Sequence, residues 1–258
     1  MRRLLTLLLI IVIIVSFGFV GIRYSANADE QDNWFNNEHR ESFARYKYLR
    51  DVLGLHWDGD AKADYLLNRK YTKLRIEVDR YDGCVISANA ISTFVSVIEP
   101  IIDKPGEIKI TMNDTISLGF ESYDSEQIRA LTDRYKSFST RGDEAVLYIL
   151  CLNKYFEAPS NIGHTVFEDG IVIFWETITE LVQGNQDVID SYVISTLLHE
   201  FGHQLGVDHV DNEQCIMAAS VESPAPVDGA VSRAATEYCD EELEEIQKVK
   251  DSLYNRKQ

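Results

Sequence analysis

Basic residues are scarce in this chain of 258 residues. It has 25 lysines and arginines against 42 aspartates and glutamates, and its formal net charge is −17. Because contacts to nucleic-acid phosphates need a basic surface, this charge argues against a general nucleic-acid-binding function. Proline is also sparse, and the sequence has no internal repeat or low-complexity tract. The composition therefore excludes collagen-like, disordered and repeat-array proteins, and the length is sufficient for one domain with a substantial core.

Acidic residues are absent from the first 28 positions, where Arg2 and Arg3 precede an uncharged apolar run over 4–22. A run of this length can cross a bilayer as a helix. An Ala-Asn-Ala sequence at 26–28 has the small-x-small pattern of a signal-peptidase site. We therefore expect 1–28 to be either a signal peptide that is cleaved near Ala28 or an uncleaved membrane anchor. Both alternatives place the rest of the chain on the extracytoplasmic side.

Cysteine is also scarce. The chain has four: Cys84, Cys151, Cys215 and Cys239. An even number of cysteines in an extracytoplasmic domain indicates disulfide bonds. Four cysteines allow three pairings, and the count alone does not choose among them. Cysteine usage therefore agrees with export.

Hydrophobic periodicity predicts a layered fold in the second part of the chain. Alternation predicts strands at 73–79, 107–112, 144–152 and 170–175, and helical spacing predicts helices at 85–102, 125–138 and 187–205. This order is typical of an α/β or α+β domain with a mainly parallel sheet. We expect 29–70 to be a membrane-proximal segment or a prosegment, and 71–258 to be the principal domain.

Three of the six histidines lie within eleven residues, in the sequence His-Glu-Phe-Gly-His-Gln-Leu-Gly-Val-Asp-His that ends at His209. Residues four apart share one face of a helix, so His199 and His203 can bind one zinc ion. Glu200 is placed to reach a water molecule on that ion. Gly206 is expected to end the helix in a left-handed conformation, which lets His209 return as the third ligand. Three protein ligands leave one tetrahedral position open, which is typical of catalytic zinc.

The pattern His-Glu-x-x-His-x-x-Gly-x-x-His, followed by a methionine, resembles the signature of the metzincin zinc endopeptidases. Met217 lies eight residues after His209, a spacing similar to that of the matrixin and archaemetzincin branches. The resemblance implies that Met217 packs beneath the imidazoles without binding the metal. It also implies an α+β zincin fold over 71–258, with an α/β-type N-terminal subdomain, a twisted mixed sheet, an active-site helix and a small C-terminal subdomain after the zinc-binding turn.

Two departures from the archaemetzincin pattern concern a second zinc site. Archaemetzincins carry a cysteine directly after the third histidine, another before the Met-turn and a later Cys-x-x-Cys. Here Val210 stands at the first of these positions and Glu242 at the last, so one catalytic zinc ion is expected. We predict that Cys215 and Cys239 instead form a disulfide bond, which leaves the other two cysteines as a second pair or as buried thiols.

The resemblance implies a zinc-dependent endopeptidase that acts on peptides or proteins; we expect it to be monomeric and, from its N-terminal segment, exported. Glu200 would then take a proton from a zinc-bound water and pass it to the leaving amine. One alternative is a catalytically weak binding protein, a pseudopeptidase, at the cell surface; another is a zinc hydrolase for non-peptide amides. The family resemblance further implies an edge strand that pairs with the substrate, for which 163–173 is the candidate, and a pocket wall formed by 218–238.

Three other features lead to narrower expectations. A carboxylate from Asp58 or Asp60 could block the zinc, as an aspartate does in astacins, although a simple turn is favoured. The acidic run at 240–242 is expected to be the solvated start of a helix. His164 is expected to be a surface residue and not a metal ligand.

Overall fold

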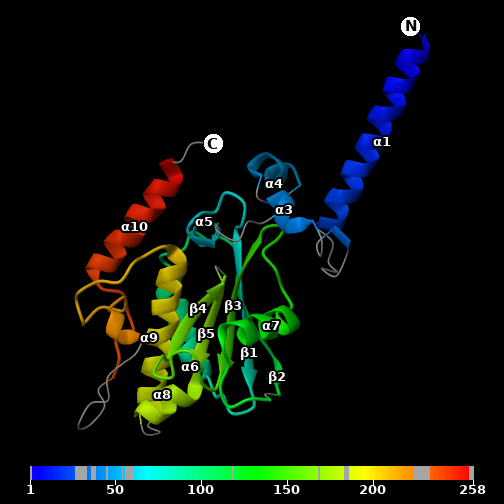
Figure 1. The fold of residues 1–258 in the computed structure, drawn as a ribbon. Coiled ribbons are helices and arrows are strands. Elements are labelled where there is room, and N and C mark those ends of the chain that lie inside the picture. Colours follow the sequence, from blue (N-terminus) through cyan, green and yellow to red (C-terminus); the bar gives the residue numbers. More distant parts are fainter. Residues whose placement is uncertain are drawn as a thin grey trace. The chain divides into compact units, whose positions relative to one another are not determined.

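The structure is a computed structural model (Figure 1) that describes residues 2–26, 34–35, 39–44, 46–53, 55, 61–117, 119–167, 169–182, 186–222 and 233–255. It divides into two compact units, Met1–Trp57 and Asp58–Gln258. The candidate blocking residues Asp58 and Asp60 lie outside the described residues.

The first unit contains three described helices: α1 (Arg2–Ala26), α3 (Arg40–Ala44) and α4 (Lys47–Leu53). Its buried apolar side chains form a small cluster of Ala26, Phe35, Leu53 and Leu55. Among the residues that the structure describes, no helix is both long enough and apolar enough to span a membrane.

The second unit is built on a five-stranded sheet with the order β2-β1-β3-β5-β4. The strands are β1 (Lys73–Tyr81), β2 (Ile108–Ile116), β3 (Glu144–Leu152), β4 (Gly163–Phe167) and β5 (Gly170–Phe174). All neighbouring pairs are parallel except β4 with β5, which is antiparallel. The mainly parallel, mixed sheet that the sequence predicts is therefore confirmed.

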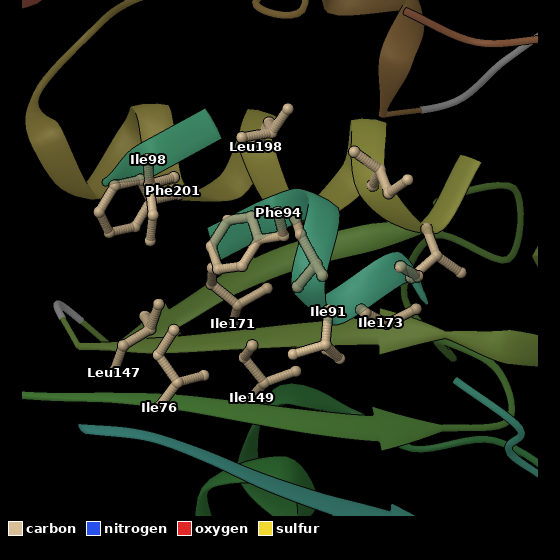
Figure 2. Close-up of a cluster of buried hydrophobic side chains, with 14 of the residues drawn as sticks. Ile76, Ile91, Phe94, Ile98, Leu147, Ile149, Ile171, Ile173, Leu198 and Phe201 are labelled. Atoms are coloured by element: carbon tan, nitrogen blue, oxygen red, sulfur yellow. The ribbon is translucent and has the colours of Figure 1, made fainter. Parts of the chain in front are cut away.

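Alternating residues of the strands form a core on each face of the sheet. On one face, Ile76, Leu147 and Ile171 pack beneath α6 (Ala88–Ile98) and α9 (Gln186–Leu205), as Figure 2 shows. On the other face, the buried side chains include Tyr148, Leu150, Val172 and Ile128, the last from α7 (Ser125–Tyr135). Strands of a parallel sheet are covered on both faces in this way, which explains their nearly continuous apolar sequences. The core thereby fixes α9 against the sheet.

Three elements differ from the sequence expectations. The range 163–173 is not one edge strand, because β4 ends at Phe167 and β5 lies inside the sheet between β3 and β4. Helices α5 (Ala61–Leu66) and α8 (Trp175–Val182) were not predicted. Hydrophobic periodicity does not distinguish a hairpin from one continuous strand when both carry apolar residues.

The predicted Cys215–Cys239 disulfide bond is present, and Cys84 and Cys151 form a second pair, one of the two alternatives for them. The alternative of two buried thiols is therefore wrong. The first bond joins the segment after β1 to the end of β3, across 67 residues of sequence. The second bond joins two segments that follow α9.

We predict that replacing Cys84 and Cys151 together by alanine lowers the free energy of unfolding by about 4 kcal/mol, because the bond closes a long loop in the unfolded chain. Urea unfolding of the oxidised proteins measures the loss. When both proteins are fully reduced, the wild type and the variant should be equally stable, because the Cys215–Cys239 bond is then broken in both. A variant as stable as the oxidised wild type would contradict the assignment.

Candidate metal centre

Helix α9 supplies two of the three histidines and is anchored by its other side chains. Phe201 is fully buried, and its ring lies 5.3 Å from that of Tyr65 and 5.8 Å from that of Phe94. His199 and His203, one turn apart, lie on the same side of the helix, with ring centroids 4.7 Å apart. The buried side chains of α9, such as Phe201, therefore fix the direction in which the two imidazoles point.

The third histidine reaches the helix through the turn that Gly206 makes possible. Gly206 has φ of +86°, a conformation that glycine adopts without strain. The chain then returns, and His209 Nε2 lies 3.1 Å from His203 Nε2 and 3.3 Å from His199 Nε2. His203 and His199 Nε2 are 3.1 Å apart. The three predicted ligands are therefore brought together at one point.

Hydrogen bonds to backbone carbonyls orient two of the rings. His199 Nδ1 lies 2.7 Å from the Ile216 carbonyl oxygen, and His203 Nδ1 lies 3.1 Å from that of Val207. A carbonyl only accepts, so each Nδ1 donates a proton and each neutral ring directs its Nε2 lone pair toward the cluster. Three converging imidazole nitrogens are a donor set that suits zinc. The residues present therefore fit the metal that the sequence motif predicts.

The turn around Met217 lies directly under α9. Met217 is fully buried, and a Cβ atom added to Gly202 would lie 2.2 Å from its sulfur. The glycine between the two helical histidines is thus what allows the methionine to approach the helix. This contact places Met217 against the part of α9 that lies between His199 and His203.

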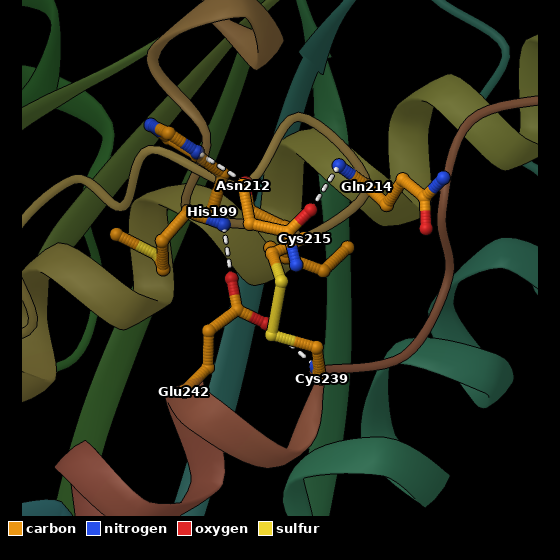
Figure 3. The surroundings of a disulfide bond; sticks show 8 residues. His199, Asn212, Gln214, Cys215, Cys239 and Glu242 are labelled. Atoms are coloured by element: carbon orange, nitrogen blue, oxygen red, sulfur yellow. Dashed lines mark hydrogen bonds between the residues drawn. A yellow bond between two sulfur atoms is a disulfide. The ribbon is translucent and has the colours of Figure 1, made fainter.

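Glu242 binds the backbone of this turn through its carboxylate, as Figure 3 shows. Its side chain is fully buried: Oε1 accepts a hydrogen bond from the Met217 backbone N–H, and Oε2 accepts one from that of Cys239 at 2.7 Å. The expectation of a solvated helix start is therefore wrong for this residue, although α10 (Asp240–Asn255) does begin there. The Cys215–Cys239 bond adds a covalent link to the same turn.

Glu200 is buried between α9 and the edge strand β4. Thr165 Oγ1 donates a hydrogen bond of 2.7 Å to Glu200 Oε2. A Cβ atom at Gly163 would lie 3.1 Å from Oε1, so the glycine permits this close approach. Burial raises the pKa of the Glu200 carboxyl to about 7, although His199 and Thr165 favour its charged form. The sequence motif did not reveal Thr165, because it lies on a separate strand.

A second carboxylate, Glu222, completes the cluster. Its Oε1 lies 3.2 Å from His209 Nε2 and 3.4 Å from each of the other two Nε2 atoms. It follows the short helix η1 (Ala219–Val221), outside the histidine motif, and nothing in its sequence spacing indicated it. His164 does not join the cluster; its ring stacks on that of Tyr155 at 5.3 Å.

One protein-family model matches the second half of the chain. The model of peptidase family M54 matches residues 131–248, a range that contains β3 to α9, the histidine cluster and Glu242. Over this range the sequence is similar to that of peptidase family M54, which confirms the resemblance to the metzincins. No match was found among curated proteins.

Solved structures that resemble the chain include two archaemetzincins. The one from Methanopyrus kandleri is 16% identical, with a TM-score of 0.49, over 71% of this chain and 98% of that chain. The one from Archaeoglobus fulgidus, complexed with malonate, is 14% identical, with a TM-score of 0.42; the match covers 66% of this chain and 98% of that chain. A zinc-dependent peptidase from Methanocorpusculum labreanum is 14% identical, with a TM-score of 0.49; the match covers 66% of this chain and 99% of that chain.

We predict that Glu242→Gln lowers the free energy of unfolding by about 1–3 kcal/mol, because an amide cannot accept both backbone hydrogen bonds in a buried position. Zinc affinity should fall with it, since the same turn orients His199. Urea unfolding and a zinc titration measure the two effects. Glu241→Gln, at the exposed neighbouring position, is the control; equal effects of the two substitutions would contradict the role of Glu242.

Proposed function

We propose that this chain is a zinc-dependent endopeptidase, in which His199, His203 and His209 hold one catalytic zinc ion and Glu200 is the general base. The observation that carries the proposal is the convergence of the three Nε2 atoms within 3.1–3.3 Å of one another, directly beside a buried glutamate. The match to peptidase family M54 over 131–248 supports it.

A zinc ion bound at this site would lower the pKa of a water molecule and polarise a peptide carbonyl. The chain's own residues supply the proton transfer. Glu200 would accept the proton of the attacking water and then donate it to the leaving amine. Thr165 donates a hydrogen bond to Oε2 of this carboxylate, so we assign Oε1 as the oxygen that accepts the proton.

Strand β4 is the element that we assign to substrate binding. It is the last strand at its end of the sheet and packs against α9. An extended peptide can pair with such an edge by β-augmentation. Thr165 belongs to this strand, so a peptide bound along it would be brought close to Glu200. The wall that we predict over 218–238 lies partly outside the described residues, which stop at Glu222 and resume at Arg233.

The two disulfide bonds and the absence of a free cysteine support an extracytoplasmic location. We assign the peptidase activity to 71–258, which contains the whole cluster. We retain the expectation that 1–28 is an export signal, either removed near Ala28 or kept as an N-terminal membrane anchor.

Hydrolysis distinguishes this function from the alternative of a binding protein. A pseudopeptidase would bind zinc without cleaving a generic quenched peptide, whereas a peptidase would cleave it and be inhibited by a chelator. A buried Glu200 with a hydrogen-bonded, oriented carboxylate favours the peptidase. Substrate profiling separates it from a hydrolase of non-peptide amides, which would use the same residues.

We predict that Glu200→Gln keeps stoichiometric zinc and lowers kcat by roughly 10²–10⁴-fold, because it removes the general base and preserves the size of the side chain. His199→Ala should lose zinc as well. Zinc content by mass spectrometry and peptide hydrolysis measure the two properties, with Glu244→Gln, at an exposed position of α10, as a control for loss of charge. Normal hydrolysis by Glu200→Gln would refute the proposal.

We predict that Thr165→Val moves the acid limb of the pH–activity profile to higher pH, by up to about one unit. The Thr165 hydroxyl stabilises the charged carboxylate and so lowers the pKa of Glu200. Removing it raises that pKa, and the base form then needs a higher pH. Thr165→Ser keeps the hydroxyl and should leave the limb in place. An unchanged limb in Thr165→Val would show that the hydrogen bond has no effect on the base.

A further inference from the structure

Four atoms of the cluster form a nearly regular tetrahedron. They are the Nε2 atoms of His199, His203 and His209 and the Oε1 atom of Glu222, and all six distances between them lie in the range 3.1–3.4 Å. A regular tetrahedron with edges of about 3.3 Å has its centre about 2.0 Å from every corner, and zinc binds nitrogen and carboxylate oxygen at about 2.0–2.2 Å. The four atoms therefore have the spacing of a complete zinc coordination shell.

Hydrogen bonds among these residues do not account for this arrangement. The Nδ1 atoms of His199 and His203 face carbonyl oxygens, so in the neutral rings the proton is on Nδ1 and Nε2 carries a lone pair. Two such lone pairs and a carboxylate oxygen would repel one another at 3.1–3.4 Å. A cation at the centre turns this repulsion into attraction.

The position of Glu222 follows from the turn that holds the histidines. It lies five residues after Met217, and η1 carries the chain across this interval. Its backbone carbonyl accepts a hydrogen bond of 2.9 Å from Ile162, the residue directly before β4. Main-chain contacts thus hold Glu222 at the metal cluster, while its side chain remains 33% exposed.

We propose that the Glu222 carboxylate is the fourth zinc ligand in the substrate-free protein and that it leaves this position when a substrate binds. The proposal rests on the proposed function for the identity of the substrate, but the ligand role stands on the cluster alone. Three histidines would leave one coordination position for water or substrate. Glu222 occupies that position, so it closes the site to small ligands until it is displaced.

The location of Glu222 links its release to the substrate strand. Its backbone is bound to the residue that precedes β4, the edge assigned to the peptide. A peptide that extends along β4 toward the zinc would meet the Glu222 segment at that end of the strand. Peptide binding and carboxylate displacement are therefore expected to occur together, which makes Glu222 a gate for the metal.

The experiment compares the full chain with its Glu222→Gln and Glu222→Ala variants after replacement of zinc by Co²⁺, whose visible absorption reports the ligands directly. Glu244→Gln, at an exposed position of α10 outside the predicted pocket wall, is the control. Acetohydroxamate, a small metal-binding probe, is titrated into each cobalt protein, and zinc affinity is measured by competition with a chelator. Circular dichroism confirms that each variant is folded.

Both Glu222 variants should show an altered cobalt spectrum, zinc affinity lower by roughly 10–100-fold, and acetohydroxamate binding that is tighter by at least about tenfold. The opposite directions of the last two changes are the signature of a displaceable ligand. Spectra and acetohydroxamate affinities equal to those of the wild type would overturn the proposal. Tighter probe binding without peptide hydrolysis in any variant would retain the gate and refute the peptidase function.

Discussion

The structure of this site depends on one constraint: three imidazole lone pairs must point at the same position, and the backbone must hold them there. Two of the rings donate Nδ1–H to the carbonyls of Ile216 and Val207, which lie on either side of the third ligand, His209. The turn that orients the rings is thus the same segment that brings His209 to the other two imidazoles. A shift of this turn would disturb all three ligands at once.

The positions of all three histidines therefore depend on how firmly this turn is held. Met217 fills the space beneath α9 that Gly202 leaves, and Glu242 accepts a hydrogen bond from its backbone N–H. The Cys215–Cys239 bond fixes the turn to the start of α10. In the resemblance to archaemetzincins, Glu242 stands at a position where those proteins carry a cysteine. Here a buried carboxylate and a disulfide bond hold the region.

The parts of this account that sequence could predict are those with local periodicity or fixed spacing. His199, His203 and His209 share a helix and its following turn, so their convergence follows from helix geometry and the left-handed Gly206. The strands with continuous apolar runs were also identified. Thr165 and Glu222 come from segments that meet the motif only after folding, and no periodicity connects them to it. The same limit concealed the burial of Glu242 and the hairpin within 163–173.

We expect this chain to bind one zinc ion through three imidazoles and one carboxylate, with no thiolate. X-ray absorption spectroscopy at the zinc edge of the zinc-loaded, substrate-free full chain identifies these ligands. We predict one zinc ion per chain with a first shell of nitrogen and oxygen atoms at about 2.0 Å, of which three are imidazole nitrogens. Sulfur atoms at about 2.3 Å would contradict it, since they would place the metal at Cys215 and Cys239.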